Sequence, residues 1–167
     1  MGCGKSSVGR EIASRLGCPF TDLDEFIEKQ QGRTVASIFS AEGEAGFRAI
    51  ELEALADVIS EYEGGTMYIS LGGGTLTIPE ARTIIGACTR CVYLRASVDT
   101  IVENLTITGT ATRPLLEGAV DEAALRERVE ALMAERSSLY EETADAIIDI
   151  DGLTTAEIAD RILSIRP

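Results

Sequence analysis

Apolar residues along this chain follow two alternating patterns. Short apolar runs of the kind that form buried strands occur at residues 18–21, 66–70, 91–94 and 146–150. Between them, apolar residues recur every three or four positions, as they do on the buried face of an α-helix. Strand-like runs that alternate with helical stretches are typical of a parallel sheet covered by helices on both faces. The pattern therefore predicts an α/β fold.

Several helical stretches show this period clearly. One contains Ile12 and Leu16, one begins near Gly43, one contains Val129 and runs toward Tyr140, and one covers residues 153–165. Residues 106–120 are weakly patterned and rich in Thr and Gly, which favours a mobile lid. A parallel sheet binds ligands at the carboxyl ends of its strands, so functional motifs should follow the strand-like runs.

Size and charge narrow the class of protein. The 167 residues are 45% hydrophobic, so we expect residues 1–167 to form one domain with a single core. A formal net charge of −13 argues against binding to nucleic acid or anionic membranes. No apolar run approaches the roughly 20 residues of a membrane span, and no secretory signal is recognisable. We expect a cytoplasmic monomer.

The chain contains no histidine, which excludes Ser/His and Cys/His nucleophilic catalysis and His-ligated metal sites. A proton acceptor near neutral pH would have to be a carboxylate or water. Cys88 and Cys91 form a C-x-x-C pair, which leaves half of a zinc site or a redox pair open. We interpret them as ordinary packing residues, because Cys91 begins an apolar run and the sequence has no second pair.

A glycine-rich segment precedes the first helical stretch. It consists of Gly2, Cys3, Gly4, Lys5, Ser6 and Ser7. This matches the second half of the phosphate loop G-x-x-x-x-G-K-[ST], in which backbone N–H groups and a helix start bind phosphate. Lys5 would reach the β- and γ-phosphates of ATP, and the Ser6 hydroxyl would bind Mg²⁺. The alternative is a glycine-rich terminus with a Ser cap.

The first glycine of the full motif, and the strand that should lead into it, would lie before Met1. That strand is central in this architecture. Without it, two strand edges would be exposed and part of the hydrophobic core would be lost. That loss would be large compared with the free energy of unfolding of a typical domain, about 5–15 kcal/mol. We therefore expect an in-frame apolar strand ending in Gly upstream of this Met.

Two carboxylates, Asp22 and Asp24, follow the first strand-like run. Alternate positions at a strand end would place both on one side. One could hold Mg²⁺, and the other could accept a proton from a substrate hydroxyl or orient it. The alternative is an N-cap and first-turn acid pair for a helix beginning near Glu25. The nearby phosphate loop favours the functional interpretation.

Three glycines, Gly72, Gly73 and Gly74, follow the second strand-like run and favour close approach of backbone to a ligand, although a wide turn is the alternative. Arg48 and Glu51 would be neighbours on a helix, where an ion pair could aim the guanidinium at a ligand carboxylate. A plain surface salt bridge is the commoner meaning of such a pair.

Two later arginines are further candidates. Arg113 lies in the R-P-L-L segment of the predicted lid, where it could neutralise charge on a transferring phosphoryl group. Arg136 lies on the late helix, four residues before Tyr140. Each could instead be a solvated surface arginine.

Together these motifs resemble the shikimate kinase family in order and spacing, over residues 2–149. Beyond the phosphate loop they include D-x-D, G-R-T-V-A-S-I-F, G-E-x-x-F-R-x-x-E, L-G-G-G, R-P-L-L and R-x-x-L-Y. The resemblance implies a three-layer P-loop kinase fold with a five-stranded parallel sheet, its first strand absent here, and a mobile lid. It also implies transfer of the γ-phosphate of ATP, with Mg²⁺, to the 3-hydroxyl of shikimate in aromatic amino-acid biosynthesis.

The resemblance also implies a role for each candidate. On the ATP side, Lys5 would contact the phosphates, Ser6 and Asp22 would hold Mg²⁺, and Arg113 would be the lid arginine on ATP. On the shikimate side, Asp24 would hold the reacting hydroxyl and Gly73 would also contact shikimate. Arg48 and Arg136 would bind the carboxylate. Many relatives carry a basic residue before R-P-L-L that packs on adenine, and residues 104–112 contain none. The alternatives are a kinase for another polyol such as gluconate and a non-catalytic or regulatory relative.

Overall fold

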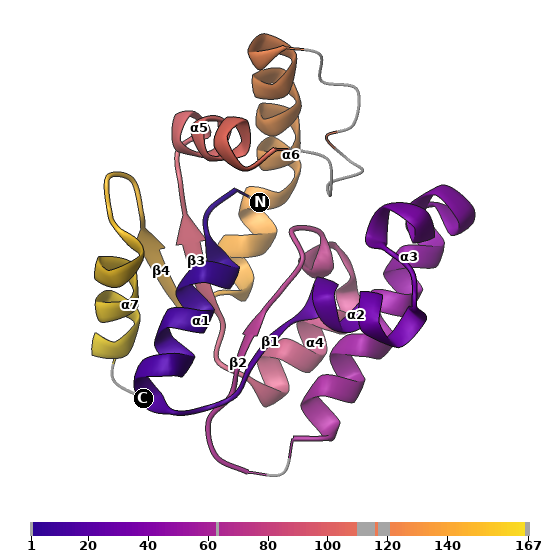
Figure 1. The fold of residues 1–167 in the computed structure, drawn as a ribbon, viewed down its shortest axis with the longest axis vertical. Helices are drawn as coiled ribbons and strands as arrows, with labels where there is room; N and C mark the ends of the chain where they lie inside the picture. The colour runs from indigo at the N-terminus through magenta and orange to yellow at the C-terminus, as the bar shows by residue number, and fades with distance from the viewer. Residues whose placement is uncertain (1, 63, 110–115, 117–120, 166–167) are drawn as a thin grey trace.

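The computed structural model describes residues 2–62, 64–109, 116 and 121–165 (Figure 1). The elements follow in the order α1 (Lys5–Leu16), β1 (Phe20–Asp22), α2 (Leu23–Gln31), α3 (Val35–Ser60), β2 (Tyr68–Ser70), η1 (Thr75–Thr77), α4 (Pro79–Cys88), β3 (Val92–Arg95), α5 (Val98–Thr108), α6 (Glu122–Thr143), β4 (Ala146–Asp149) and α7 (Thr155–Ser164). Strands and helices alternate much as the apolar pattern predicts.

The described strands form two parallel pairs. β1 lies beside β2, with Phe20 opposite Tyr68, and β3 lies beside β4, with Val92 opposite Ala146. Each of the four predicted strand-like runs overlaps one of these strands, and the ends differ by up to two residues. The parallel arrangement predicted from the alternation of elements is therefore confirmed.

Helices cover both faces of the strands. In β2, Tyr68 packs with the cluster formed by α1 and α7, whereas the next residue, Ile69, packs with the cluster formed by α2, α3 and α4. In β3, Leu94 packs with the cluster of α1 and α7, and Tyr93 packs with the cluster of α2, α3 and α4. Successive strand residues point to opposite faces, so this division means that each face is buried under helices. Figure 1 shows α1 in front of the strands and α4 behind them.

A cavity of about 880 Å³ lies between the two strand pairs. It is lined by Tyr68 of β2 and Val92 of β3 at its sides, by Ile12 of α1 and by Ile85 of α4. No strand pairing joins β2 to β3 within the described ranges. The strand expected to lead into the phosphate loop stays a prediction.

Local side chains explain where the helices begin and bend. Thr34 caps α3, because its hydroxyl accepts a hydrogen bond from the N–H of Ser37. The same helix is interrupted at Gly43, whose φ of 70° and ψ of −178° suit glycine. The helix predicted to begin near Gly43 is thus the second half of α3, and its first half was missed.

Two other features differ from the sequence prediction. Helices α4 and α5 were not among the stretches with clear periodicity. Because α5 continues to Thr108, the first residues of the predicted lid are helical. Leu116 is buried against α5 and α6, and Arg113 lies outside the described residues. No helix in the described part of the chain is long and apolar enough to span a bilayer.

Two glycines inside helices have opposite surroundings. A Cβ at Gly9 of α1 would lie 2.3 Å from the Phe20 ring, whereas a Cβ at Gly86 of α4 would meet nothing within 4 Å. Glycine inside a helix costs about 1 kcal/mol relative to Ala. The missing side chain of Gly9 therefore lets β1 pack closely on α1, while Gly86 has no such role.

We predict opposite effects of Gly9→Ala and Gly86→Ala on the free energy of unfolding. Gly9→Ala should destabilise, because overpacking costs about 1–3 kcal/mol and outweighs the gain in helix propensity. Gly86→Ala should stabilise by up to about 1 kcal/mol. Urea unfolding measures both. A Gly9→Ala protein as stable as Gly86→Ala would show that the Phe20 ring is free to move aside.

Candidate active site

The glycine-rich segment forms a loop that leads directly into α1. Gly2 and Gly4 have φ values of 64° and 71°, a left-handed conformation that favours glycine. Gly4 is the N-cap, with no side-chain hydrogen bond, so the alternative of a Ser cap is wrong. Asn104 of α5 donates a hydrogen bond of 2.7 Å to the Gly2 carbonyl. The unpaired N–H groups at the start of this helix suit an anion such as phosphate.

Lys5 is the first residue of α1 and lies among negative and polar groups. The Cys3 thiolate favours the charged ammonium, burial opposes it, and Asp24 and Asp22 add to the favourable interactions. The net result is that the pKa of Lys5 lies above its ordinary value. A charged ammonium beside a helix N-terminus is the group needed to neutralise phosphate oxygens.

Ser6 joins the end of β1 to the end of β2. Its hydroxyl donates a short hydrogen bond to Asp22, and its oxygen lies 3.3 Å from the hydroxyl of Ser70. Hydroxyl and carboxylate oxygens are the donors that Mg²⁺ prefers, and Mg²⁺ keeps further positions for water and substrate phosphates. The residues present therefore fit the predicted role of Ser6 and Asp22. Ser70 was not predicted as a site residue.

The two acidic residues occupy different elements. Asp22 ends β1 and caps α2 by accepting from the N–H of Asp24 at 3.1 Å and of Glu25 at 3.4 Å. Asp24 lies in the first turn of α2, so its predicted place on a strand end is wrong. The alternative of an N-cap and first-turn acid pair therefore describes the positions of both Asp22 and Asp24 correctly, but it does not explain the acidic environment of Asp24.

Asp24 is a half-buried carboxyl in an acidic neighbourhood. Burial first, and then the charges of Asp22 and Glu51, raise the pKa of Asp24 to about 6, although Lys5 acts in the opposite direction. Its Oδ1 would lie 3.3 Å from a Cβ at Gly72, so it borders the three-glycine segment. A carboxylate with a pKa near neutral is well matched to accepting a proton.

Arg48 and Glu51 form an inward-facing ion pair on α3. Arg48 Nη1 donates to Glu51 Oε2 at 2.6 Å, and Thr75 Oγ1 donates to Glu51 Oε1, also at 2.6 Å. The Glu51 side chain is fully buried and that of Arg48 is 14% exposed. The alternative of a plain surface salt bridge is therefore wrong. The carboxylates of Glu51 and Glu44 outweigh burial and keep the pKa of Arg48 above its ordinary value.

The three glycines make room for these side chains. A Cβ at Gly72 would lie 2.5 Å from Glu51 Oε1, and a Cβ at Gly74 would lie 2.1 Å from Arg48 Nη2. Neither glycine has a positive φ. Glycine is therefore required at these positions for space rather than for backbone conformation. The backbone here is approached closely by the side chains of Glu51 and Arg48, and the predicted close approach of a ligand stays a prediction.

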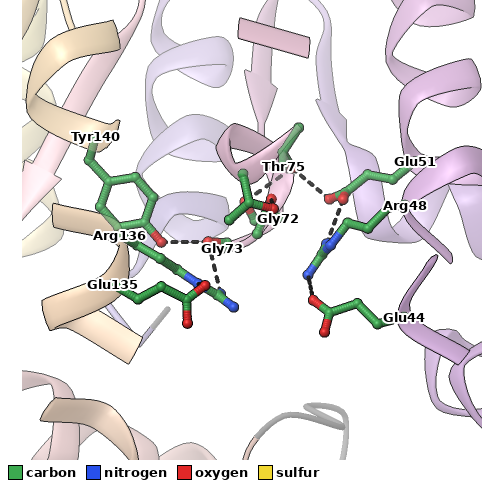
Figure 2. Close-up of polar contacts among 11 residues, drawn as sticks. Glu44, Arg48, Glu51, Gly72, Gly73, Thr75, Glu135, Arg136 and Tyr140 are labelled. Carbon is green, nitrogen blue, oxygen red and sulfur yellow. Dashed lines mark hydrogen bonds and ion pairs between the residues drawn. The ribbon is translucent and has the colours of Figure 1, made fainter. Parts of the chain in front are cut away.

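Arg136 reaches the same segment from α6. Its side chain is 4% exposed, so the alternative of a solvated helix arginine is wrong. Arg136 Nη1 donates to the Gly73 carbonyl at 3.3 Å, and the Tyr140 hydroxyl donates a short hydrogen bond to that carbonyl. Figure 2 shows Arg48 and Arg136 approaching from opposite sides of the glycine segment. The structure thus brings together two arginines that are far apart in the sequence.

Both guanidinium groups have unused hydrogen-bonding capacity. The Nε atoms of Arg48 and Arg136 are buried and have no hydrogen-bond partner among the described residues. An unpaired buried donor is costly and often marks a place where a ligand binds. Two such donors beside a glycine segment suit a small ligand that carries a carboxylate.

Among the other candidates, Cys88 is exposed and Cys91 is half-buried, and both are free thiols. Burial raises the pKa of Cys91 to about 11, which does not suit a reactive thiolate. No group of three or more metal-ligating side chains is found in the described ranges. Asn104, Ser70 and Thr75 were not predicted as site residues, because the contacts that bring them to the site cross a long sequence separation.

A phosphate-binding helix start beside a carboxyl and two arginines, on a three-layer α/β fold, defines the class as P-loop kinases of small molecules. A family model described as shikimate kinase matches residues 1–166. The chain therefore belongs to the shikimate kinase family, a family of ATP-dependent phosphotransferases. The resemblance recognised in its motifs is confirmed.

Individual relatives agree with this assignment. The shikimate kinase of Streptomyces coelicolor is 40% identical over 163 residues, which cover 98% of this chain and 89% of that protein. The shikimate kinase of Francisella tularensis subsp. novicida is 36% identical over 162 residues, with 97% and 88% covered. These shares mean that the relatives and this chain correspond over nearly their whole lengths.

Solved structures agree as well. The shikimate kinase from Acinetobacter baumannii in complex with shikimate is similar with a TM-score of 0.89 at 32% identity, covering 99% of this chain and 87% of that chain. The shikimate kinase from Bacteroides thetaiotaomicron gives a TM-score of 0.88 at 28% identity, with 99% and 93% covered. The P-loop kinase fold predicted from the sequence is confirmed.

We predict that Thr75→Val destabilises the fold by about 1–3 kcal/mol, because the buried Glu51 carboxylate loses a hydrogen-bond donor. Thr83→Val is a matched control, since Thr83 is exposed on α4 and its hydroxyl donates to the Pro79 carbonyl. The control should change the free energy of unfolding by less than about 0.5 kcal/mol. Equal effects of the two substitutions would contradict the importance of the Glu51 contact.

Proposed function

We propose that this chain transfers the γ-phosphoryl group of ATP to the 3-hydroxyl of shikimate, giving shikimate 3-phosphate and ADP. The observation that carries the proposal is the pairing of Arg48 and Arg136 across the three-glycine segment, beside the half-buried Asp24. Shikimate is a small acid with several hydroxyl groups. It needs cations for its carboxylate and an acceptor for its reacting hydroxyl, and this site offers both.

The phosphates of ATP would bind at the start of α1. Backbone N–H groups of Gly2 to Ser7 and the Lys5 ammonium supply donors and positive charge there. Ser6 and Asp22 would hold Mg²⁺, which would offset the negative charge of the phosphate oxygens. Asn104 supports this loop through the Gly2 carbonyl. The predicted contact of Arg113 with ATP lies outside the described residues and stays a proposal.

The acid would bind between α3 and α6. Arg48 and Arg136 would hold the carboxylate, and Gly72, Gly73 and Gly74 would allow the ring to approach the backbone closely. Asp24 would accept the proton of the 3-hydroxyl as its oxygen attacks phosphorus. Phosphoryl transfer needs little covalent chemistry from protein groups, so catalysis consists of positioning and charge stabilisation. The cytoplasmic location and the monomeric state stay predictions from the sequence.

A coupled assay that detects ADP tests the proposal with Mg-ATP and either shikimate or gluconate. We expect ADP release that depends on shikimate, and loss of turnover in Lys5→Ala, which removes the phosphate-binding charge. Turnover with gluconate alone would show a different polyol kinase. Shikimate binding without phosphoryl transfer would show a non-catalytic relative.

We predict that kcat/KM for shikimate falls as the pH drops through about 6, the pKa of Asp24. The sign follows from the role: below that pH the carboxyl is protonated in the free enzyme and cannot accept the hydroxyl proton. Asp24→Asn should lower kcat by about 100- to 10,000-fold, and its residual activity should lack this acidic step. An acidic step that persists unchanged in Asp24→Asn would assign it to another group.

A further inference from the structure

The guanidinium of Arg48 has two acidic partners of different character. Nη1 donates to Glu51 Oε2 at 2.6 Å, and Nη2 donates to Glu44 Oε1 at 3.0 Å (Figure 2). Glu51 is fully buried, whereas the side chain of Glu44 is 51% exposed. Glu51 is also fixed by Thr75, so it cannot leave without abandoning a second buried hydrogen bond. Glu44 is therefore the partner that a ligand can displace.

The backbone places Glu44 at this position. Gly43 interrupts α3, and Glu44 is the first residue after that break, four positions before Arg48. A pair with this spacing lies on one helix face. The carboxylate of Glu44 thus reaches the solvent side of the guanidinium, while Glu51 holds the inner side.

A ligand carboxylate must use the nitrogen that Glu44 occupies. Carboxylates bind guanidinium best through two parallel N–H bonds, and Nε with Nη2 forms such a fork. Because Nη1 belongs to Glu51, this fork is what Arg48 has to offer an acid. Glu44 takes Nη2 alone and leaves Nε unpaired. An acid that bound both nitrogens would satisfy the unpaired donor and displace Glu44.

We propose that Glu44 is an internal competitor for the carboxylate of the substrate, so that its exchange for the incoming acid limits the affinity of this site. The inference rests on the proposed function, because it takes Arg48 as a carboxylate-binding residue. Glu44 weakens acid binding in two ways: it occupies Nη2, and its negative charge repels the approaching anion. Ligands without a carboxylate gain nothing from its removal.

Titration calorimetry of the full chain with shikimate, without nucleotide, tests the proposal. Glu44→Gln should bind shikimate roughly two- to fivefold more tightly than wild type, the range expected for one exposed ion pair. Glu53→Gln removes an equal charge from an exposed position of the same helix and should leave the affinity unchanged. The difference between wild type and Glu44→Gln should shrink at high salt. The methyl ester of shikimate should bind wild type and Glu44→Gln equally.

The outcomes separate this inference from the proposed function. If neither wild type nor Glu44→Gln binds shikimate, the proposed function fails and the inference fails with it. If wild type binds and Arg48→Ala does not, Arg48 is confirmed as the acid-binding residue. In that case, the inference would be overturned if Glu44→Gln and Glu53→Gln bound shikimate with the same affinity. Weaker binding by Glu44→Gln would also overturn it and would assign Glu44 to holding Arg48 in place.

Discussion

A fully buried carboxylate, that of Glu51, is the constraint on which the site depends. An ionised carboxylate in a protein interior is unfavourable unless it is paired and hydrogen-bonded. Arg48 supplies the charge, and Thr75 supplies a hydroxyl donor. The absence of a side chain at Gly72 leaves room for the Glu51 oxygen. One buried charge thus requires an arginine, a threonine and a glycine from two separate segments to meet, which fixes α3 against the turn after β2.

The same charge affects the chemistry of its neighbour Asp24. Burial is the main cause of the raised pKa of Asp24, and the negative charges of Asp22 and Glu51 add to it. The group that orients Arg48, the proposed acid-binding residue, therefore also helps to make Asp24, the proposed proton acceptor, more basic. Two tasks of the proposed reaction, holding the carboxylate and accepting the hydroxyl proton, depend on one buried side chain. Removing its charge would alter both, so a change at this position could not be interpreted as the loss of a single contact.

The sequence predicts best what is local. The phosphate loop, the run of glycines and the spacing of Arg48 from Glu51 can be recognised in the sequence, because each involves only neighbouring residues. Burial cannot be recognised in this way. It is burial that excludes the surface alternatives for Arg48 and Arg136, and it depends on packing between distant elements. Tertiary hydrogen bonds could not be predicted either, because no local pattern indicates that Asn104 donates to the Gly2 carbonyl of the phosphate loop. Helices α4 and α5 were not recognised, although Val98, Ile101, Val102 and Leu105 of α5 recur at helical spacing.

Charge balance explains how a chain with a net charge of −13 can bind anions. The site cations among the described residues lie near acids: Lys5 near Asp22 and Asp24, Arg48 near two glutamates of α3, and Arg136 at 3.6 Å from Glu135. Such a site has no large excess of positive charge to attract anions indiscriminately. At Arg48, we infer that binding proceeds by exchange, in which a ligand oxygen replaces the Glu44 oxygen on a cation that is already oriented. Selectivity then depends on geometry, because only a ligand that satisfies more donors than the departing side chain gains free energy from the exchange.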